Sequence, residues 1–180
     1  DTVVEFVDAL FGNSIGVPPD QGLVDIWDKM ATKRYANKVP PGYLDASKKT
    51  GEFVDRNVVY QAPNGDLYVW MQLLDAVRAN KKDFSSVLFV TDDRKPDWWA
   101  MSGSKITGPR VELRQEIANA GSASFHMYTF SQFLEHVRTN EKKGSQSLSA
   151  ATLAEVRKVD QLSERWESAR SLVREIGAEA

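Results

Sequence analysis

The sequence predicts an α/β fold with a parallel sheet, and two observations support this class. Residues 87–91 form an unbroken apolar or β-branched run that ends in the adjacent carboxylates Asp92 and Asp93. A short apolar run bounded by polar residues is typical of a strand buried on both faces, as in a parallel sheet. Amphipathic helical patterns lie before and after it, at 67–80 and 110–120, and a second strand is predicted at 124–129.

Composition limits the kinds of site that this chain can build. Its 180 residues are 42% hydrophobic and 27% charged, as in an ordinary globular domain. The absence of cysteine excludes disulfides and zinc–thiolate sites, and only His126 and His136 are available as imidazoles. A metal site must therefore use oxygen ligands, which favours magnesium or manganese over zinc. The net charge of -2 does not by itself indicate a nucleic-acid binder, although a local basic surface could act as one.

The amino-terminal part is predicted to be helical. Apolar spacing indicates helices at 2–11 and 23–33, and Trp27 is predicted to lie in the core. Basic residues gather at the end of the second helix, including Arg34 and Lys38. Because the chain begins with Asp1, we expect a processed or cropped amino end. There is no apolar run of membrane-spanning length and no signal-peptide pattern, so we expect a cytoplasmic protein without membrane contact.

The segment 38–49, KVPPGYLDASKK, is a candidate site loop. Residues 40–42 break any helix and force an ordered turn, which we expect to present Asp45, Lys48 and Lys49 in an exposed segment. An acid beside lysines suits a site that holds a metal and a phosphate. The alternative is a surface loop in which Asp45 caps a helical turn at 46–50.

Two further acidic positions have both a structural and a functional interpretation. Asp66 heads the 67–80 helix, where an N-cap role would explain it fully. Asp92 and Asp93 follow the central strand, at the end where open parallel sheets carry their ligand sites. Strand alternation places Asp93 on the side of Phe89, with Asp92 on the opposite side, so we favour Asp93 as the site residue.

The remaining elements carry less chemistry. Trp98 and Trp99 could stack bases, but packing is the more common role for such a pair. His126 in the second strand is predicted to be an interior imidazole. A helix at 130–141 should bury Phe133, Leu134 and Val137. A polar linker at 141–147 leads to a long amphipathic helix at 148–176, which could pack on its own domain, form a homo-oligomer or recruit a partner protein.

The order of motifs provides a family resemblance. The chain contains KVPPGYLDASKK, GDLYVW, VTDDRKPDWW, GPRVELRQE and FHMY in this order, followed by a Phe-Leu helix. From about Arg34 to Leu134 it resembles the PIN-like domains of the PIN nuclease superfamily. Walker, dinucleotide, HExxH and GxSxG motifs are absent. The resemblance implies a three-layer α/β fold over residues 1–143, with a central parallel sheet flanked by helices. Residues 144–180 are predicted separately, as the linker and the long amphipathic helix.

The resemblance also implies a function. Active members cut phosphodiester bonds with acid-bound Mg²⁺ or Mn²⁺, and RNA is a more common substrate than DNA. The matched acids are Asp45, Asp66 and Asp93, with Asp92 as a further metal ligand and Asp97 as a match of undefined role. Basic residues at or near the motifs are candidates for nucleic-acid contact: Arg34, Lys38, Lys48, Lys49 and Arg94.

One departure from the family pattern leaves alternatives open. PIN-like domains normally begin with a strand that ends in a metal-binding Asp, and residues 1–33 do not resemble it, since Asp8 and Asp25 stand in helical patterns. We expect either that a preceding segment is missing or that the domain is degenerate. A catalytically incomplete binding module is therefore the main alternative to a nuclease, and a magnesium-dependent phosphatase is a third.

Overall fold

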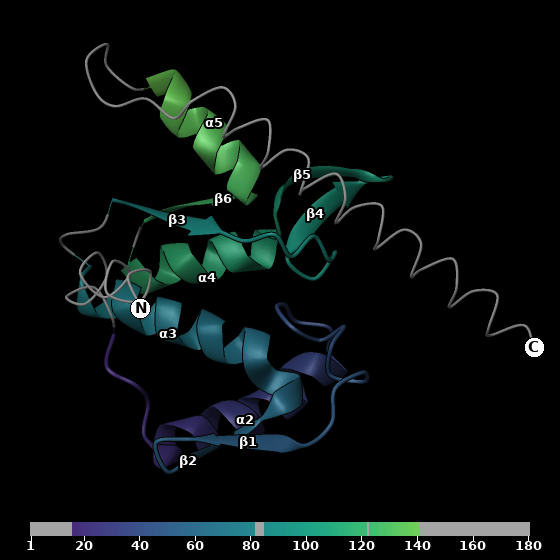
Figure 1. Cartoon of the computed structure of the whole chain (residues 1–180), viewed down its shortest axis with the longest axis vertical. Coiled ribbons are helices and arrows are strands. Elements are labelled where there is room, and N and C mark those ends of the chain that lie inside the picture. The colour runs from purple at the N-terminus through teal and green to yellow at the C-terminus, as the bar shows by residue number, and fades with distance from the viewer. Residues whose placement is uncertain (1–15, 82–84, 122, 141–180) are drawn as a thin grey trace, which may run out of the picture. The chain divides into compact units, whose positions relative to one another are not determined.

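The computed structural model describes residues 16–81, 85–121 and 123–140, which fall into two units (Figure 1). The first unit contains the described residues of 1–87 together with 94–126, and the second contains 88–93 and the described residues of 127–180. The helices predicted at 2–11 and 148–176, and the linker between 141 and 147, lie outside the described residues. The boundary at 143/144 stays a prediction.

Three helices build most of the first unit. These are α2 (Gln21–Ala36), α3 (Gly65–Ala79) and α4 (Val111–Gly121), and α3 packs against both of the others (Figure 1). The helical spacing of apolar residues predicted all three. The carboxylate of Asp20 caps α2 by accepting a hydrogen bond from the Leu23 amide at 2.8 Å.

An aromatic cluster fills the interior of the first unit. Trp70 is fully buried, and its ring lies 5.4 Å from that of Phe125 and 6.1 Å from that of Trp98, edge-on in both cases. Trp27 is buried beside Tyr68, as the sequence predicts. Edge-to-face packing of such large side chains contributes stability beyond the area that they bury. Trp98 is therefore a packing residue.

Two short hairpins complete the first unit. The pair β1 (Glu52–Asp55) and β2 (Val58–Gln61) is antiparallel and turns at Arg56 and Asn57, which both have positive φ. A 3₁₀ turn, η1 (Ala62–Asn64), leads into α3. The second antiparallel pair is β4 (Trp99–Ser102) and β5 (Lys105–Pro109). Neither hairpin was predicted from the sequence.

The parallel pairing that defines the fold class is confirmed. Strands β3 (Ser86–Val90) and β6 (Ser124–Tyr128) form a two-stranded parallel sheet. The amide of Ser124 donates to the Ser85 carbonyl at 3.0 Å, and that of Thr91 donates to the Tyr128 carbonyl at 3.0 Å. The chain is thus an α/β protein, whereas the three-layer arrangement stays a prediction.

The prediction that β3 is buried on both faces is wrong. Val87 is buried, but Leu88 is 49% and Val90 37% exposed, so the side chains alternate between a covered and an open face. The same alternation overturns the prediction for His126. Its neighbours Phe125 and Met127 point inward, and the imidazole lies on the exposed face.

Helix α5 (Phe130–Asn140) is present as predicted, but its apolar stripe is only half-buried. The side chains of Phe133, Leu134 and Val137 are intermediate in exposure. The ring of His136 stacks on that of Tyr128 at the end of β6, with centroids 5.7 Å apart. Within the described ranges, no helix is long and apolar enough to cross a bilayer, and the cytoplasmic location stays a prediction.

Candidate cation-binding site

A buried aspartate holds the loop that follows α2. Oδ2 of Asp97 accepts hydrogen bonds from the amides of Gly42, at 3.0 Å, and Leu44, at 3.2 Å. Asp97 itself is completely buried. The two prolines before Gly42 are also buried, and the bond between them is cis. The ordered turn at 40–42 is therefore confirmed, but its first half lies inside the protein.

Gly42 brings the loop against α2 and α3. Its φ is +91°, a conformation that favours glycine, and an added Cβ would lie 2.9 Å from Oη of Tyr35 and 3.1 Å from Cβ of Asp66. Only a residue without a side chain allows this approach. The consequence is that the turn, the end of α2 and the start of α3 meet at one place.

Two of the predicted acids converge there on a single cation. Nζ of Lys95 lies 3.0 Å from Oδ2 of Asp45 and 3.6 Å from Oδ2 of Asp66. The side chains of Asp45 and Asp66 are 9% and 21% exposed, and that of Lys95 is 31% exposed. Opposite charge at this distance offsets the mutual repulsion of the carboxylates. The structure thus brings together Asp45 and Asp66, which lie 21 positions apart in the sequence.

Lysines surround Asp45 on more than one side. Nζ of Lys49 lies 2.7 Å from its Oδ2, and Nζ of Lys48 lies 3.9 Å from its Oδ1. Burial alone would raise the pKa of Asp45, but hydrogen bonds and charge from Lys49 and Lys95 outweigh burial and hold the pKa below its ordinary value of 3.8. Asp45 is therefore ionised at neutral pH.

The expected exposure of Asp45 is wrong, whereas Lys48 and Lys49 are exposed as predicted. The helical turn of the alternative interpretation does form, since the carbonyl of Asp45 accepts hydrogen bonds from the amides of Lys48 and Lys49. The carboxylate, however, faces the lysine ammonium groups. A capping role for this side chain does not account for its contacts.

Asp66 is not the N-cap of its helix. Helix α3 begins at Gly65, two residues earlier than predicted, its N-cap is Asn64, and Asp66 lies in the first turn. Oδ2 of Asp66 instead accepts a long hydrogen bond, 3.4 Å, from Nε1 of Trp98. Its place in the first turn still suits the positive end of the helix dipole.

Two buried polar atoms beside the carboxylates have no hydrogen-bond partner: Oη of Tyr35 and Oδ1 of Asp97. Burial raises the pKa of the Tyr35 hydroxyl, and the negative charge of Asp66 raises it further, so the phenol stays protonated. Burial also raises the pKa of Asp97, and the amide of Leu44 and the charge of Lys95 oppose that shift only partly. The site therefore keeps unused hydrogen-bonding capacity in its floor.

The other two predicted acids lie in the second unit. Oδ1 of Asp92 accepts the amide of Phe130 at 3.0 Å, which caps the start of α5. The backbone amide of Asp93 donates a hydrogen bond to Oγ1 of Thr91 at 3.1 Å. Because these residues belong to a different unit from Asp45 and Asp66, a cluster of all the predicted acids stays a prediction.

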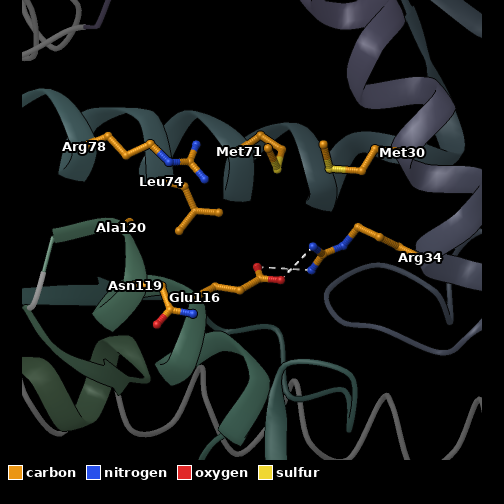
Figure 2. Close-up of a pocket in the computed structure, with 8 residues that line it drawn as sticks. All are labelled: Met30, Arg34, Met71, Leu74, Arg78, Glu116, Asn119 and Ala120. Carbon is orange, nitrogen blue, oxygen red and sulfur yellow. Dashed lines mark hydrogen bonds and ion pairs between the residues drawn. The ribbon is translucent and has the colours of Figure 1, made fainter.

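The predicted nucleic-acid residues divide into engaged and exposed groups. The guanidinium of Arg34 binds Glu116, with Nη1 2.7 Å from Oε1, and also contacts the Pro40 carbonyl. Figure 2 shows this pair at one side of a pocket lined by α2, α3 and α4. Arg34 thus ties the site loop to the helices. Lys38, Lys48 and Lys49 are exposed, and Arg94 is half-buried.

Sequence reasoning missed Lys95, Tyr35 and the role of Asp97. Lys95 stands inside the quoted motif VTDDRKPDWW, so its position was available, but a lysine among acids resembles a surface charge. Tyr35 ends a helix with an ordinary amphipathic pattern. No local signal shows that Asp97 reaches back 55 residues to Gly42.

A family model supports the resemblance that these motifs carry. The model of the PIN-like domain matches residues 1–113, which is more than half of the chain. The chain belongs to the PIN-like domain family. Its matched region includes Asp45, Asp66, Asp93 and Asp97, and it ends before β6, whereas the resemblance in the sequence motifs runs to Leu134. No curated protein and no solved structure matches the chain.

PIN domains generally use divalent metals. The question for this PIN-like domain is whether its carboxylates could hold such an ion. Within 16–81, 85–121 and 123–140, no three His, Cys, Asp or Glu side chains gather closely enough to hold an ion. Mg²⁺ nevertheless requires only one or two carboxylates when water and phosphate oxygens complete its shell. Asp45 and Asp66 supply such a pair of hard oxygen donors, already directed at one cation. The residues present therefore fit a two-carboxylate site.

Proposed function

We propose that this PIN-like domain is a metal-dependent nuclease that hydrolyses phosphodiester bonds, with RNA preferred over DNA. The observation that carries the proposal is the convergence of Asp45 and Asp66 on one cation position in a chain whose superfamily usually consists of nucleases. Asp45 and Asp66 would hold one Mg²⁺ or Mn²⁺. Asp93 keeps its proposed role as a third catalytic carboxylate, and Asp92 as a further metal ligand.

The chemistry required of the chain is mostly positioning. A bound divalent ion lowers the pKa of an attacking water and neutralises charge on the scissile phosphate. Asp45 is suited to hold that ion because its low pKa keeps it ionised. The buried turn at 40–44 fixes the backbone that carries Asp45, and helix α3 fixes Asp66. Neither carboxylate needs to be ordered when a substrate arrives.

The exposed lysines next to Asp45 are the proposed phosphate contacts. Lys48 and Lys49 leave the buried turn on its solvent side, with Lys38 and Arg94 as further candidates. Lysine contacts of this kind give binding that weakens as salt concentration rises. Arg34 was also a sequence candidate, but its ion pair with Glu116 commits it to the fold. RNA preference rests on family membership alone.

Substitution of the proposed ligands tests the function. Asp66→Asn and Asp93→Asn should each abolish Mn²⁺-dependent cleavage of a single-stranded RNA while leaving the circular dichroism spectrum unchanged. Asp75→Asn is the matched control for Asp66, since Asp75 lies on the same helix and pairs with Arg78 at the surface. Full cleavage by both site variants would remove the proposal.

One observation favours a second candidate, a catalytically incomplete module that binds nucleic acid or protein. Lys49 and Lys95 already neutralise the two acids, and no three-acid cluster forms within the described residues. Calorimetry with Mn²⁺ separates the candidates. Absence of both binding heat and a melting-temperature shift favours the module.

A chromogenic phosphate ester assayed beside the RNA distinguishes a phosphatase, the third candidate. Association through residues 144–180 stays a prediction.

A further inference from the structure

Lys95 places a positive charge at the proposed ion site. Its ammonium group contacts both Asp45 and Asp66, the two carboxylates that would hold a divalent ion. An ammonium group and a divalent ion at the same pair of carboxylates repel each other, because both carry positive charge. Binding of a divalent ion at the pair therefore favours movement of Lys95 away from it.

The structure allows that movement. The carbonyl of Lys95 accepts hydrogen bonds from the amides of Trp98 and Trp99, at 3.0 and 3.1 Å, and both tryptophans are buried. The backbone of Lys95 is thus fixed, while its ammonium group is carried on a flexible four-carbon stem. The side chain is partly exposed. The ammonium group can leave the carboxylates without a change in the fold.

The charge at the site indicates where it would go. Asp45 and Asp66 carry two negative charges, and Lys49 and Lys95 carry two positive charges, so the four groups are neutral together. With a divalent ion on the carboxylates the same groups carry an excess of two positive charges. An anion then becomes the favoured partner of the released Lys95 ammonium group, and a phosphodiester supplies one.

We infer that Lys95 is a substrate-binding residue that moves from the Asp45–Asp66 pair to the substrate phosphate when a divalent ion binds. This inference rests on the proposed function, since it takes a phosphodiester as the substrate. It adds an order to the reaction, in which metal binding precedes tight binding of RNA. It also assigns a role to a lysine that sequence patterns did not single out.

Two binding measurements on the full chain test the inference. Lys95→Met should bind Mn²⁺ about tenfold more tightly than the unmodified chain in calorimetry, because no ammonium competes for the carboxylates. The same variant should bind a short single-stranded RNA more weakly at saturating Ca²⁺. Its slope of log affinity against log salt should fall by about 0.7, as expected for one lost phosphate contact on a single strand.

Lys105→Met is the control for a general loss of positive charge, because Lys105 is exposed at the start of β5 and is not one of the proposed phosphate contacts. A general loss of positive charge would affect both variants equally. Lys95→Gln provides a second variant that keeps a polar side chain, and circular dichroism checks the fold of each.

The outcomes are distinguishable. Tighter Mn²⁺ binding with weaker RNA binding, in Lys95→Met but not in Lys105→Met, supports the inference. Equal Mn²⁺ affinity in the two variants overturns it, as does unchanged RNA affinity at saturating Ca²⁺. If the unmodified chain binds Mn²⁺ and cuts RNA in either of these cases, only the role of Lys95 fails. If no form of the chain binds Mn²⁺, the proposed function fails as well.

Discussion

The buried turn at 40–44 and the carboxylate pair beside it use aspartate in opposite ways. The turn is held by Asp97, which is completely buried and accepts hydrogen bonds from two backbone amides of the turn. Its pKa is raised because burial penalises its charge. At the pair, Asp45 faces lysines that outweigh burial and lower its pKa. The comparison shows that one aspartate fixes the backbone while the other retains its charge.

Asp97→Ala should be the most damaging change. It leaves the amides of Gly42 and Leu44 without their acceptor in a region closed to water. An unsatisfied buried donor costs about 1–3 kcal/mol, so we expect the free energy of unfolding to fall by about 3 kcal/mol in urea denaturation. Asp75→Ala on the surface should change it by less than about 0.5 kcal/mol. Equal stability of the two variants would contradict the structural role of Asp97.

Two glycines with the same φ sharpen the comparison. Gly42 and Gly51 both have φ of +91°, but a Cβ at Gly42 would crowd Tyr35 and Asp66, whereas none of the neighbouring atoms lies within 4 Å at Gly51. Gly51→Ala should cost about 1 kcal/mol for the left-handed conformation alone. Gly42→Ala should cost at least about 1 kcal/mol more, measured by the same denaturation. Similar losses at both sites would show that the close approach is not needed.

Opposite pH dependence should follow from the opposite pKa shifts. Asp45→Asn should destabilise by about 1–2 kcal/mol at neutral pH, because lysine hydrogen bonds are lost. A lowered pKa means that the contribution of Asp45 is complete above pH 3.8 and is lost as pH falls through the folded pKa. The difference between the variant and the unmodified chain should therefore shrink below pH 3.8.

For Asp97 the pH dependence of the contribution to stability has the opposite sign. Its raised pKa means that its contribution is complete below pH 3.8 and is lost as pH rises through the folded pKa. Asp97→Asn keeps one oxygen that can accept both amides, so it should lie within about 1 kcal/mol of the unmodified chain. Its relative stability should increase as pH rises above 3.8. Parallel pH profiles for the two asparagine variants would contradict the contrast.

The smallest effect is expected in the second unit. Asp92→Ala removes the acceptor of the Phe130 amide at the start of α5, and loss of such a cap costs about 1 kcal/mol. Asp92→Asn should retain most of that stability, since an amide oxygen also caps helices. Hydrogen exchange in α5 measures the change locally. Unchanged exchange in Asp92→Ala would show that the cap does not stabilise α5.

Local patterns predicted the helices α2 to α5 and the two parallel strands, but neither hairpin. The helical spacing that places Trp27 inside, and the strand candidates at 86–91 and 124–129, depend on neighbours close in the sequence. The same spacing cannot reveal partners that are distant in the sequence. Asp97 holds Gly42, Lys95 bridges Asp45 and Asp66, and Arg34 reaches Glu116 across 82 positions. Each of these contacts exists only after the helices have packed.

Errors in burial have a related cause. The run at 87–90 is apolar at every position, which predicts two covered faces, but coverage depends on what packs above each face. Alternation then decides the outcome residue by residue, as His126 shows between Phe125 and Met127. Asp45 was predicted to be exposed because prolines and lysines flank it. The amides held by Asp97 draw the turn inward instead.

The reach of Asp97 has a consequence for synthesis of the chain. The hydrogen bonds to Gly42 and Leu44 span 55 and 53 positions. Residue 97 must therefore leave the exit tunnel of the ribosome before these hydrogen bonds can form. Until then Asp45 and Asp66 also lack Lys95, and the two acids have no fixed separation. Nascent chains that stop short of this point should be readily cleaved by proteases near Gly42, whereas slightly longer ones should resist.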